Sequence, residues 1–190
     1  MNNDTDLIER ARNGDKAAFK ELVVKHKKNV YYLAYDLTRC REDAEDVSQD
    51  VFVKVYNSLK KFRGDSKFSS WLYRITVNTC YSLKRKKNYS AMKTSEDIEN
   101  LNDSNYGINS LNDISPEKQT ESGFIKANIE HALQKLPQKE RTIFIMRNYS
   151  GMPFNEIVEI LNLKPGTVRS ANFKALKKLR KALVIYKDHI

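Results

Sequence analysis

The chain has 190 residues, and its 34 Lys and Arg against 24 Asp and Glu give a formal net charge of +10. Its longest apolar run is far shorter than the roughly 20 residues that a membrane-spanning helix needs, and its acidic N-terminus is unlike a secretory signal peptide. Cys40 and Cys80 belong to no CxxC pair, which argues against a disulfide scaffold or a zinc finger, and we expect both to be buried small hydrophobic residues. We therefore expect a basic, helical, soluble protein of a reducing compartment.

Charge divides the chain into three parts. Residues 91–121 carry a net charge of −5, while the parts before and after them carry +7 and +8. The acidic part is rich in Asn, Asp and Ser and has no apolar period, so it cannot bury enough surface to offset the entropy lost on ordering. We predict two domains, residues 1–87 and 123–190, joined by a flexible acidic linker of residues 88–122. This linker either serves as a simple tether or lies in a basic groove, where it mimics nucleic acid.

In the first basic part, apolar residues recur at three- and four-residue steps, the spacing of one face of an α-helix. The spacing predicts a short helix near residues 5–12 and a long helix that follows Asp15, its N-cap. Further helices are predicted near residues 44–60 and 68–87, separated by a turn at residues 63–66. Short connections between three or four helices are typical of a small bundle.

The second basic part shows the same helical spacing. It predicts helices near residues 124–136, 138–149, 154–162 and 165–184. Pro137 suits the first turn of the second of these helices, because its missing N–H would have no partner there in any case. We predict an all-α protein with two small helical domains, of three or four helices in the first and four in the second.

The strongest motif is a helix, a tight turn and a second helix within residues 154–173. A helix-turn-helix places its second helix in the major groove of DNA, with its N-terminal residues at the base edges. Val168, Ala175 and Leu179 would face the core, while Arg169 would point outward, where a guanidinium is suited to bond a guanine. The alternative is an ordinary helical hairpin with a solvated basic face.

Three carboxylates, of Asp43, Asp46 and Asp50, fall on one face of a predicted helix, beside a separate apolar stripe. Carboxylates repel DNA, so we interpret this face as a surface that binds a basic protein. A solvated face and a Mg²⁺ site are the alternatives. The metal site is disfavoured because no His or companion acidic cluster completes it, and we predict neither metal nor cofactor.

Aromatic residues alternate with cations over residues 62–87, as in surfaces that stack on bases while holding the nucleic-acid backbone. We expect Phe68, Trp71 and Leu72 in the core, and polar and basic side chains on the opposite side of the helix. The loop at residues 62–70 is suited to hold a base pulled out of the stack, which lowers the cost of unpairing.

Taken together, these segments resemble an alternative sigma factor of bacterial RNA polymerase, of the small extracytoplasmic-function group. Residues 43–52 match the core-binding segment of that family, and residues 68–78 match its segment for melting and for the minus-ten element. Residues 136–144, Glu156-Ile157 and residues 166–170 match its C-terminal helix-turn-helix domain. The motifs occur in the family's order.

The resemblance implies a cytoplasmic factor with no catalytic group and no cofactor. The first domain, sigma region 2, would bind core polymerase and would read and melt the minus-ten element. The second, sigma region 4, would read the minus-thirty-five element. The implied partners are core RNA polymerase, through the coiled coil of its largest subunit and its flap region, promoter DNA and an anti-sigma factor. The linker would pass through the RNA exit path of the enzyme, and no membrane insertion is expected.

The residues that the resemblance assigns to sites fall into three sets. The core-binding set is Asp43, Asp46, Gln49, Asp50 and Phe52. The minus-ten set is Arg63, Lys67, Arg74, Asn78, Tyr81, Lys84 and Arg85. The minus-thirty-five set is Thr167, Arg169, Ser170, Asn172, Phe173, Lys174 and Lys177.

Several positions depart from the family pattern, and two of them lie next to each other. Ala171 stands where a cation is common, and Asn172 stands where an apolar residue is usual, so Asn172 either contacts DNA or leaves the core less tight.

Two rival functions stay open. A regulator that binds operators alone as a dimer would share the helix-turn-helix motif but leave the acidic face unexplained. A nuclease would use the acidic cluster with Mg²⁺.

Overall fold

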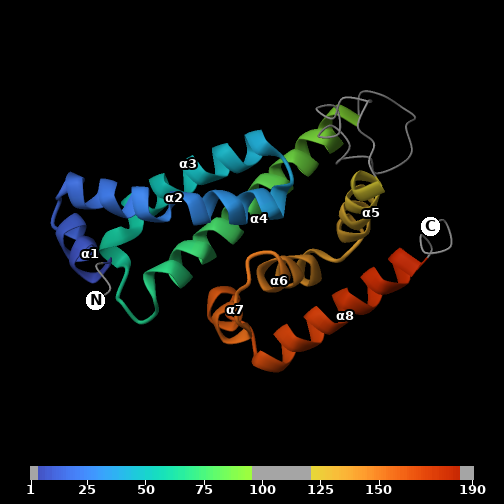
Figure 1. Cartoon of the computed structure of the whole chain (residues 1–190). Helices are drawn as coiled ribbons and strands as arrows, with labels where there is room; N and C mark the ends of the chain where they lie inside the picture. The colour runs from blue at the N-terminus through green and yellow to red at the C-terminus, as the bar shows by residue number, and fades with distance from the viewer. Residues whose placement is uncertain (1–3, 96–120, 185–190) are drawn as a thin grey trace. The chain divides into compact units, whose positions relative to one another are not determined.

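The computed structural model describes residues 4–95 and 121–184, and every element of secondary structure within these two ranges is helical. The chain forms two compact units, Met1–Ser104 and Asn105–Ile190. Figure 1 shows the helices of the first unit in blue to green and those of the second in yellow to red. The structure confirms the predicted all-α fold with two helical domains.

Helix α2 is the centre of the first unit. The helices of this unit are α1 (Asp4–Arg12), α2 (Lys16–Thr38), α3 (Arg41–Ser58), η1 (Leu59–Lys61) and α4 (Phe68–Ser95). Helices α1, α3 and α4 all pack against α2, and α3 also packs against α4 (Figure 1). The core between them is aliphatic, and its most deeply buried side chains include Leu22, Val30, Leu33, Val47, Val51, Val55 and Leu72.

The start of α2 is fixed by Asp15. Its side chain accepts hydrogen bonds from the backbone N–H groups of Ala17 at 2.9 Å and Ala18 at 3.1 Å. The bond from Ala18, together with one from the guanidinium of Arg10 at 2.7 Å, holds the pKa of Asp15 below its ordinary value. Helix α2 therefore begins at the N-cap that the sequence predicts.

An aromatic cluster holds the start of α4 against the rest of its unit. Phe68 and Leu72 are buried, as predicted, whereas Trp71 is half-buried. The ring centroid of Trp71 lies 5.0 Å from that of Phe62, which is itself buried. The loop before α4 is therefore anchored at Phe62 by aromatic packing.

The two cysteines lie in different environments. Cys80 is buried, as predicted. Cys40 is half-buried at the N-cap of α3, and its thiol donates a hydrogen bond to the carboxylate of Glu42 at 3.0 Å. The prediction was wrong for Cys40 because a residue between two helices is not enclosed by either. Partial burial and the Glu42 carboxylate both raise the pKa of the Cys40 thiol.

Helices extend into both ends of the predicted linker. Helix α4 continues beyond residue 87 to Ser95, and the next helix begins at Glu121, before residue 123. Apolar periodicity marks the packed part of a helix, and a helix can continue beyond its packed part, so the sequence places the first boundary too early. Residues 96–120, the rest of the predicted linker, lie outside the described residues.

Helix α8 is the centre of the second unit. The helices are α5 (Glu121–Gln134), α6 (Gln138–Asn148), α7 (Phe154–Leu161) and α8 (Pro165–Val184), and the first three all pack against α8. One core cluster joins the end of α5 and the short connection after it to α8, through Ala132, Leu133, Leu136, Ala175 and Leu179. Helices α6 and α7 add the fully buried side chains of Ile143, Ile145, Met146, Ile157 and Ile160.

A tight turn joins α7 to α8. Asn162 takes the left-handed conformation, with φ 51°, and its N–H bonds the carbonyl of Val158. Asn tolerates this conformation better than most residues with a Cβ. Helix α8 then begins at Pro165, which suits a first helical turn. The predicted helix-turn-helix is therefore formed.

Candidate functional site

Helix α3 presents carboxylates to solvent. Asp46 and Asp50 are exposed, and so is Gln49 between them. Asp43 is different, because only 17% of its side chain is exposed and both of its carboxylate oxygens lie 2.7 Å from Nζ of Lys87 on α4. This hydrogen bond raises the pKa of Lys87. Asp46 and Asp50 are therefore the carboxylates of this set that a partner reaches most directly.

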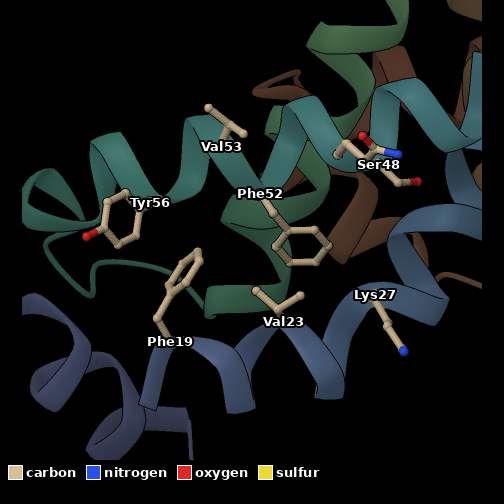
Figure 2. Close-up of a pocket in the computed structure, with 8 residues that line it drawn as sticks. Phe19, Val23, Lys27, Ser48, Phe52, Val53 and Tyr56 are labelled. Atoms are coloured by element: carbon tan, nitrogen blue, oxygen red, sulfur yellow. The ribbon is translucent and has the colours of Figure 1, made fainter. Parts of the chain in front are cut away.

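An apolar groove of about 540 Å³ lies between α2 and α3. Figure 2 shows Phe19 and Val23 on α2 facing Phe52 on α3 across this groove. Its full lining is Phe19, Val23, Lys27, Ser48, Gln49, Phe52, Val53 and Tyr56. Two of these side chains, Val53 and Tyr56, are 59% and 53% exposed. Apolar surface gathered in this way is typical of a protein-binding site.

Of the residues that line this groove, the core-binding set predicted from the sequence includes only Gln49 and Phe52. A second helical stripe on α3, at positions 49, 52, 53 and 56, was the signal that marks Val53 and Tyr56. On α2, helical spacing places Phe19 with the core residues, but it lies at the edge of that stripe, and its ring packs edge-on against Tyr56 at 5.0 Å.

The loop before α4 carries two of the residues assigned to the minus-ten element. Arg63 and Lys67 are both exposed. Nε of Arg63 lies 3.1 Å from a carboxylate oxygen of Asp65 in the same loop. Gly64 has φ 83°, a conformation that residues with a Cβ rarely adopt, so the chain turns sharply at this point.

The outer side of α4 is polar and basic. Among the residues assigned to it, the exposed ones are Asn78, Lys84 and Arg85, and the half-buried ones are Arg74 and Tyr81. The structure thus brings side chains that suit phosphate and base contacts onto one helix, next to the Arg63–Lys67 loop in the chain.

Helix α8 separates an inner apolar face from an outer polar face. Val168, Ala175 and Leu179 are buried, as predicted. The outer face begins at Thr167, which is half-buried, and its exposed members are Arg169, Ser170, Phe173, Lys174 and Lys177. Phe173 is unusual for a large apolar side chain because it is 68% exposed.

Asn172 lies on the inner face of α8, and its assignment to the DNA-contacting set was wrong. It is only 8% exposed, and its Oδ1 accepts a hydrogen bond from Nδ2 of Asn148 on α6 at 3.3 Å. Asn172 follows Val168 by four residues and precedes Ala175 by three, so helical geometry turns it inward. Ala171, where the family pattern has a cation, is also buried.

The described residues offer neither a metal site nor a membrane span. Within residues 4–95 and 121–184, no group of three or more His, Cys, Asp or Glu is placed to hold a metal ion. None of the helices in the described parts of the chain has the length and apolarity to cross a membrane.

Both units match models of one protein family. Residues 22–89 match Sigma-70 region 2, and residues 126–179 match Sigma-70 region 4. The RNA polymerase sigma-H factor of Pseudomonas aeruginosa is 35% identical over 184 residues, which cover 95% of this chain and 93% of that protein. The chain belongs to the extracytoplasmic-function sigma factors. The ECF RNA polymerase sigma-E factor of Haemophilus influenzae is 37% identical over 180 residues, 90% of each chain.

Solved structures share the fold of this sigma factor. CnrH, in complex with the cytosolic domain of CnrY, matches with a TM-score of 0.68 at 24% identity and covers 96% of this chain and 97% of its own. RpoE of Bartonella quintana, in complex with the anti-sigma factor NepR, matches with a TM-score of 0.63 at 21% identity, covering 88% of this chain and 97% of its own. As a member of the family, the chain acts in promoter-directed initiation of transcription by RNA polymerase.

Proposed function

We propose that this sigma factor divides promoter-directed initiation among three surfaces. The acidic face of α3 and the apolar groove beside it bind core polymerase. The Arg63–Lys67 loop and the outer side of α4 read and open the minus-ten element, and the outer face of α8 reads the minus-thirty-five element. The observation that carries this proposal is the segregation of charge, because exposed carboxylates and apolar side chains gather on α3 while exposed cations gather on α4 and α8.

The polymerase surface is suited to a helix that is basic on one side. An amphipathic helix can lay its apolar side chains into a groove such as the one that Phe19, Phe52 and Tyr56 line. The exposed carboxylates of Asp46 and Asp50 then meet its cations. The coiled coil of the largest polymerase subunit is the partner that the family resemblance implies for this helix.

The minus-ten surface combines cations with a turn that can accept a base. Arg63 and Lys67 attract the backbone of a separated strand, and the sharp turn at Gly64 gives a nucleotide close access to the loop backbone. Unstacking a base costs a few kcal/mol. Contacts with core polymerase offset this cost, so the proposal does not require the isolated chain to open DNA.

The minus-thirty-five surface is suited to the major groove of duplex DNA. The N-terminal end of a recognition helix approaches the base edges, and Arg169 lies in the first turns of α8. A guanidinium forms two hydrogen bonds with guanine, and an apolar side chain such as Phe173 is suited to a thymine methyl group. Lys174 and Lys177 supply phosphate contacts.

The proposal includes a setting and a regulator. We propose that the factor acts in the cytoplasm without a catalytic group of its own and that an anti-sigma factor holds it inactive. Support comes from the family resemblance. Among the solved structures with this fold, RpoE of Bartonella quintana was captured with an anti-sigma factor.

Run-off transcription tests the proposal as a whole. Purified core polymerase, with and without the full chain, transcribes a promoter library in which only the minus-ten and minus-thirty-five elements vary. We expect the chain to confer initiation at a restricted set of sequences at both elements. Initiation that is equally indiscriminate with and without the chain would refute the proposal, and tight specific binding by the chain alone would favour the operator-binding regulator.

A further inference from the structure

A polar pair interrupts the packing between α6 and the recognition helix. Oδ1 of Asn172 accepts a hydrogen bond from Nδ2 of Asn148 at 3.3 Å, and Asn172 is buried, with only 8% of its surface exposed. Asn148 is the last residue of α6 and is exposed. The pair therefore ties the end of one helix to the inner face of another.

The donor of this pair is itself fixed to α6. Nδ2 of Asn148 also donates to the backbone carbonyl of Phe144, one turn earlier, at 2.9 Å. An amide NH₂ group has two hydrogens, so these two bonds use its full donor capacity. The side chain of Asn148 cannot rotate freely without breaking one of them, and the position it offers to Asn172 is set by α6.

Asn172 is a polar residue in an otherwise apolar stretch of the inner face of α8. Its neighbours on that face, Val168 and Ala175, are buried and apolar, and Ala171 beside it is small. Apolar contacts are non-directional. A hydrogen bond is directional, and a buried carbonyl that loses its donor is costly. In coiled coils, a single buried Asn fixes register in this way at some cost in stability.

We propose that the Asn148–Asn172 pair is a positioning device that sets the register and rotation of α8, and so determines how sharply the sigma factor discriminates bases in the minus-thirty-five element. This inference rests on the proposed function of α8. Asn172 lies next to Phe173 and three residues after Arg169, so any change in the setting of the inner face moves these outer side chains directly. Recognition groups need placement within about 0.5 Å to act.

The test uses full-length variants with core polymerase. Run-off transcription is measured on promoters that share one minus-ten element and differ by single bases in the minus-thirty-five element, and the readout is the ratio between the preferred and the substituted sequence. For Asn172→Leu, which has a similar shape but cannot bond Asn148, we expect this ratio to fall roughly threefold to tenfold. We expect its thermal unfolding temperature to be equal to or above that of the unmodified chain, because an apolar side chain then fills an apolar site.

Two variants on α6 complete the design. Asn148→Ala removes the donor at an exposed helix end and keeps the test valid should Asn172→Leu fail to fold. We expect it to reduce the ratio as Asn172→Leu does, with no further loss in the double variant, since both remove one interaction. Asn148→Gln keeps an amide donor at this position, and we expect it to discriminate better than Asn148→Ala and to retain most of the ratio of the unmodified chain.

The outcomes separate this inference from the proposed function. If the unmodified chain shows no dependence on the minus-thirty-five sequence, the proposed function of α8 is refuted and the inference falls with it. If the unmodified chain discriminates and Asn148→Ala leaves the ratio unchanged, only the inference is overturned. An equal loss of transcription at every minus-thirty-five sequence would assign the pair to stability alone. Additive losses in the double variant would show that the two residues act independently, and either result overturns the inference.

Discussion

Helices α4 and α8 both present cations, but their cations are engaged differently within their own units. On α8, Lys174 and Lys177 are exposed beside Arg169, and Lys178, which lies outside the proposed recognition set, pairs with the carboxylate of Glu140 at 2.9 Å. On α4, Lys87 is the last cation of the run at residues 84–87. It pairs with the carboxylate of Asp43 on α3, the helix that we propose binds polymerase.

This difference has a consequence for how each helix is controlled. In the second unit, the inner face of α8 is packed and the outer cations that we propose contact DNA are exposed. The basic surface of the first unit is tied through Lys87 and Asp43 to α3. A partner that binds α3 is therefore placed to change what the end of α4 offers to DNA, whereas the ion pair of Lys178 joins α8 to Glu140 on α6, which belongs to no proposed partner surface.

The largest effect is expected where α3 meets polymerase. The double variant Asp46→Lys and Asp50→Lys replaces attraction by repulsion at a basic partner, and we expect it to weaken binding to core polymerase by about 2–5 kcal/mol. Competition for core polymerase against the unmodified chain measures the change. The matched control reverses two exposed carboxylates elsewhere in the unit, Glu9→Lys and Glu21→Lys, and should compete normally. Equal competition by both double variants would contradict the proposed polymerase surface.

A position-specific effect is expected on α8. Arg169→Ala should cost about 1–3 kcal/mol at one base pair of the minus-thirty-five element, because a guanidinium that bonds a base edge discriminates at that position alone. Transcription from single-base promoter variants measures it. Arg180→Ala removes an exposed cation farther along the same helix and should leave base preference unchanged. A uniform loss over all sequences would instead show that Arg169 contacts phosphate.

A smaller effect is expected from the tie between α3 and α4. Asp43→Asn removes the charge that neutralises Lys87, so the isolated chain should bind DNA a few-fold more tightly at low salt. Because one more cation meets phosphate, the slope of log affinity against log salt should steepen by up to about 0.9. Fluorescence anisotropy over a salt series measures the slope. Adding Lys87→Gln to the variant should return the slope to its starting value, and a slope that stays steep would show that Lys87 is not the cation involved.

The sequence predicts helices well wherever packing imposes a period. Val168, Ala175 and Leu179 lie where helical spacing places them, and Asp15 caps the helix that its type and position indicate. The same period also places Asn172 inward, but its polar side chain favoured a contact with DNA in the sequence analysis. At that position spacing was the better guide, because a buried polar group needs only one partner to be accommodated.

Other features could not be predicted because they depend on contacts between segments that are distant in sequence. The ion pair of Asp43 with Lys87 joins residues on two helices, and no local pattern links them. The groove could not be predicted for the same reason, because a second apolar stripe on α3 does not reveal whether another helix covers that stripe. Only the arrangement of α2 and α3 shows that Val53 and Tyr56 stay exposed (Figure 2).

The smallest effect is expected at the cap of α2, and it should depend on pH. Asp15→Ala removes the acceptor for two backbone N–H groups and should lower the thermal unfolding temperature of the first unit by about 2–8 °C at neutral pH. The folded state holds the pKa of Asp15 below its ordinary value, so the stabilisation by its charged form is complete above the ordinary carboxylate pKa of about 4. It is lost as the pH falls through the lowered value.

Asp15→Asn isolates the charge from the cap. Asn is as good an N-cap as Asp, so this variant should retain most of the stability at neutral pH, but it also loses the charge that faces Arg10. The difference between the unmodified chain and Asp15→Asn should therefore shrink in acid, while that between Asp15→Asn and Asp15→Ala stays constant. Calorimetry from neutral pH to about pH 3 follows both differences. A difference from Asp15→Asn that grows in acid would show that the carboxylate destabilises α2.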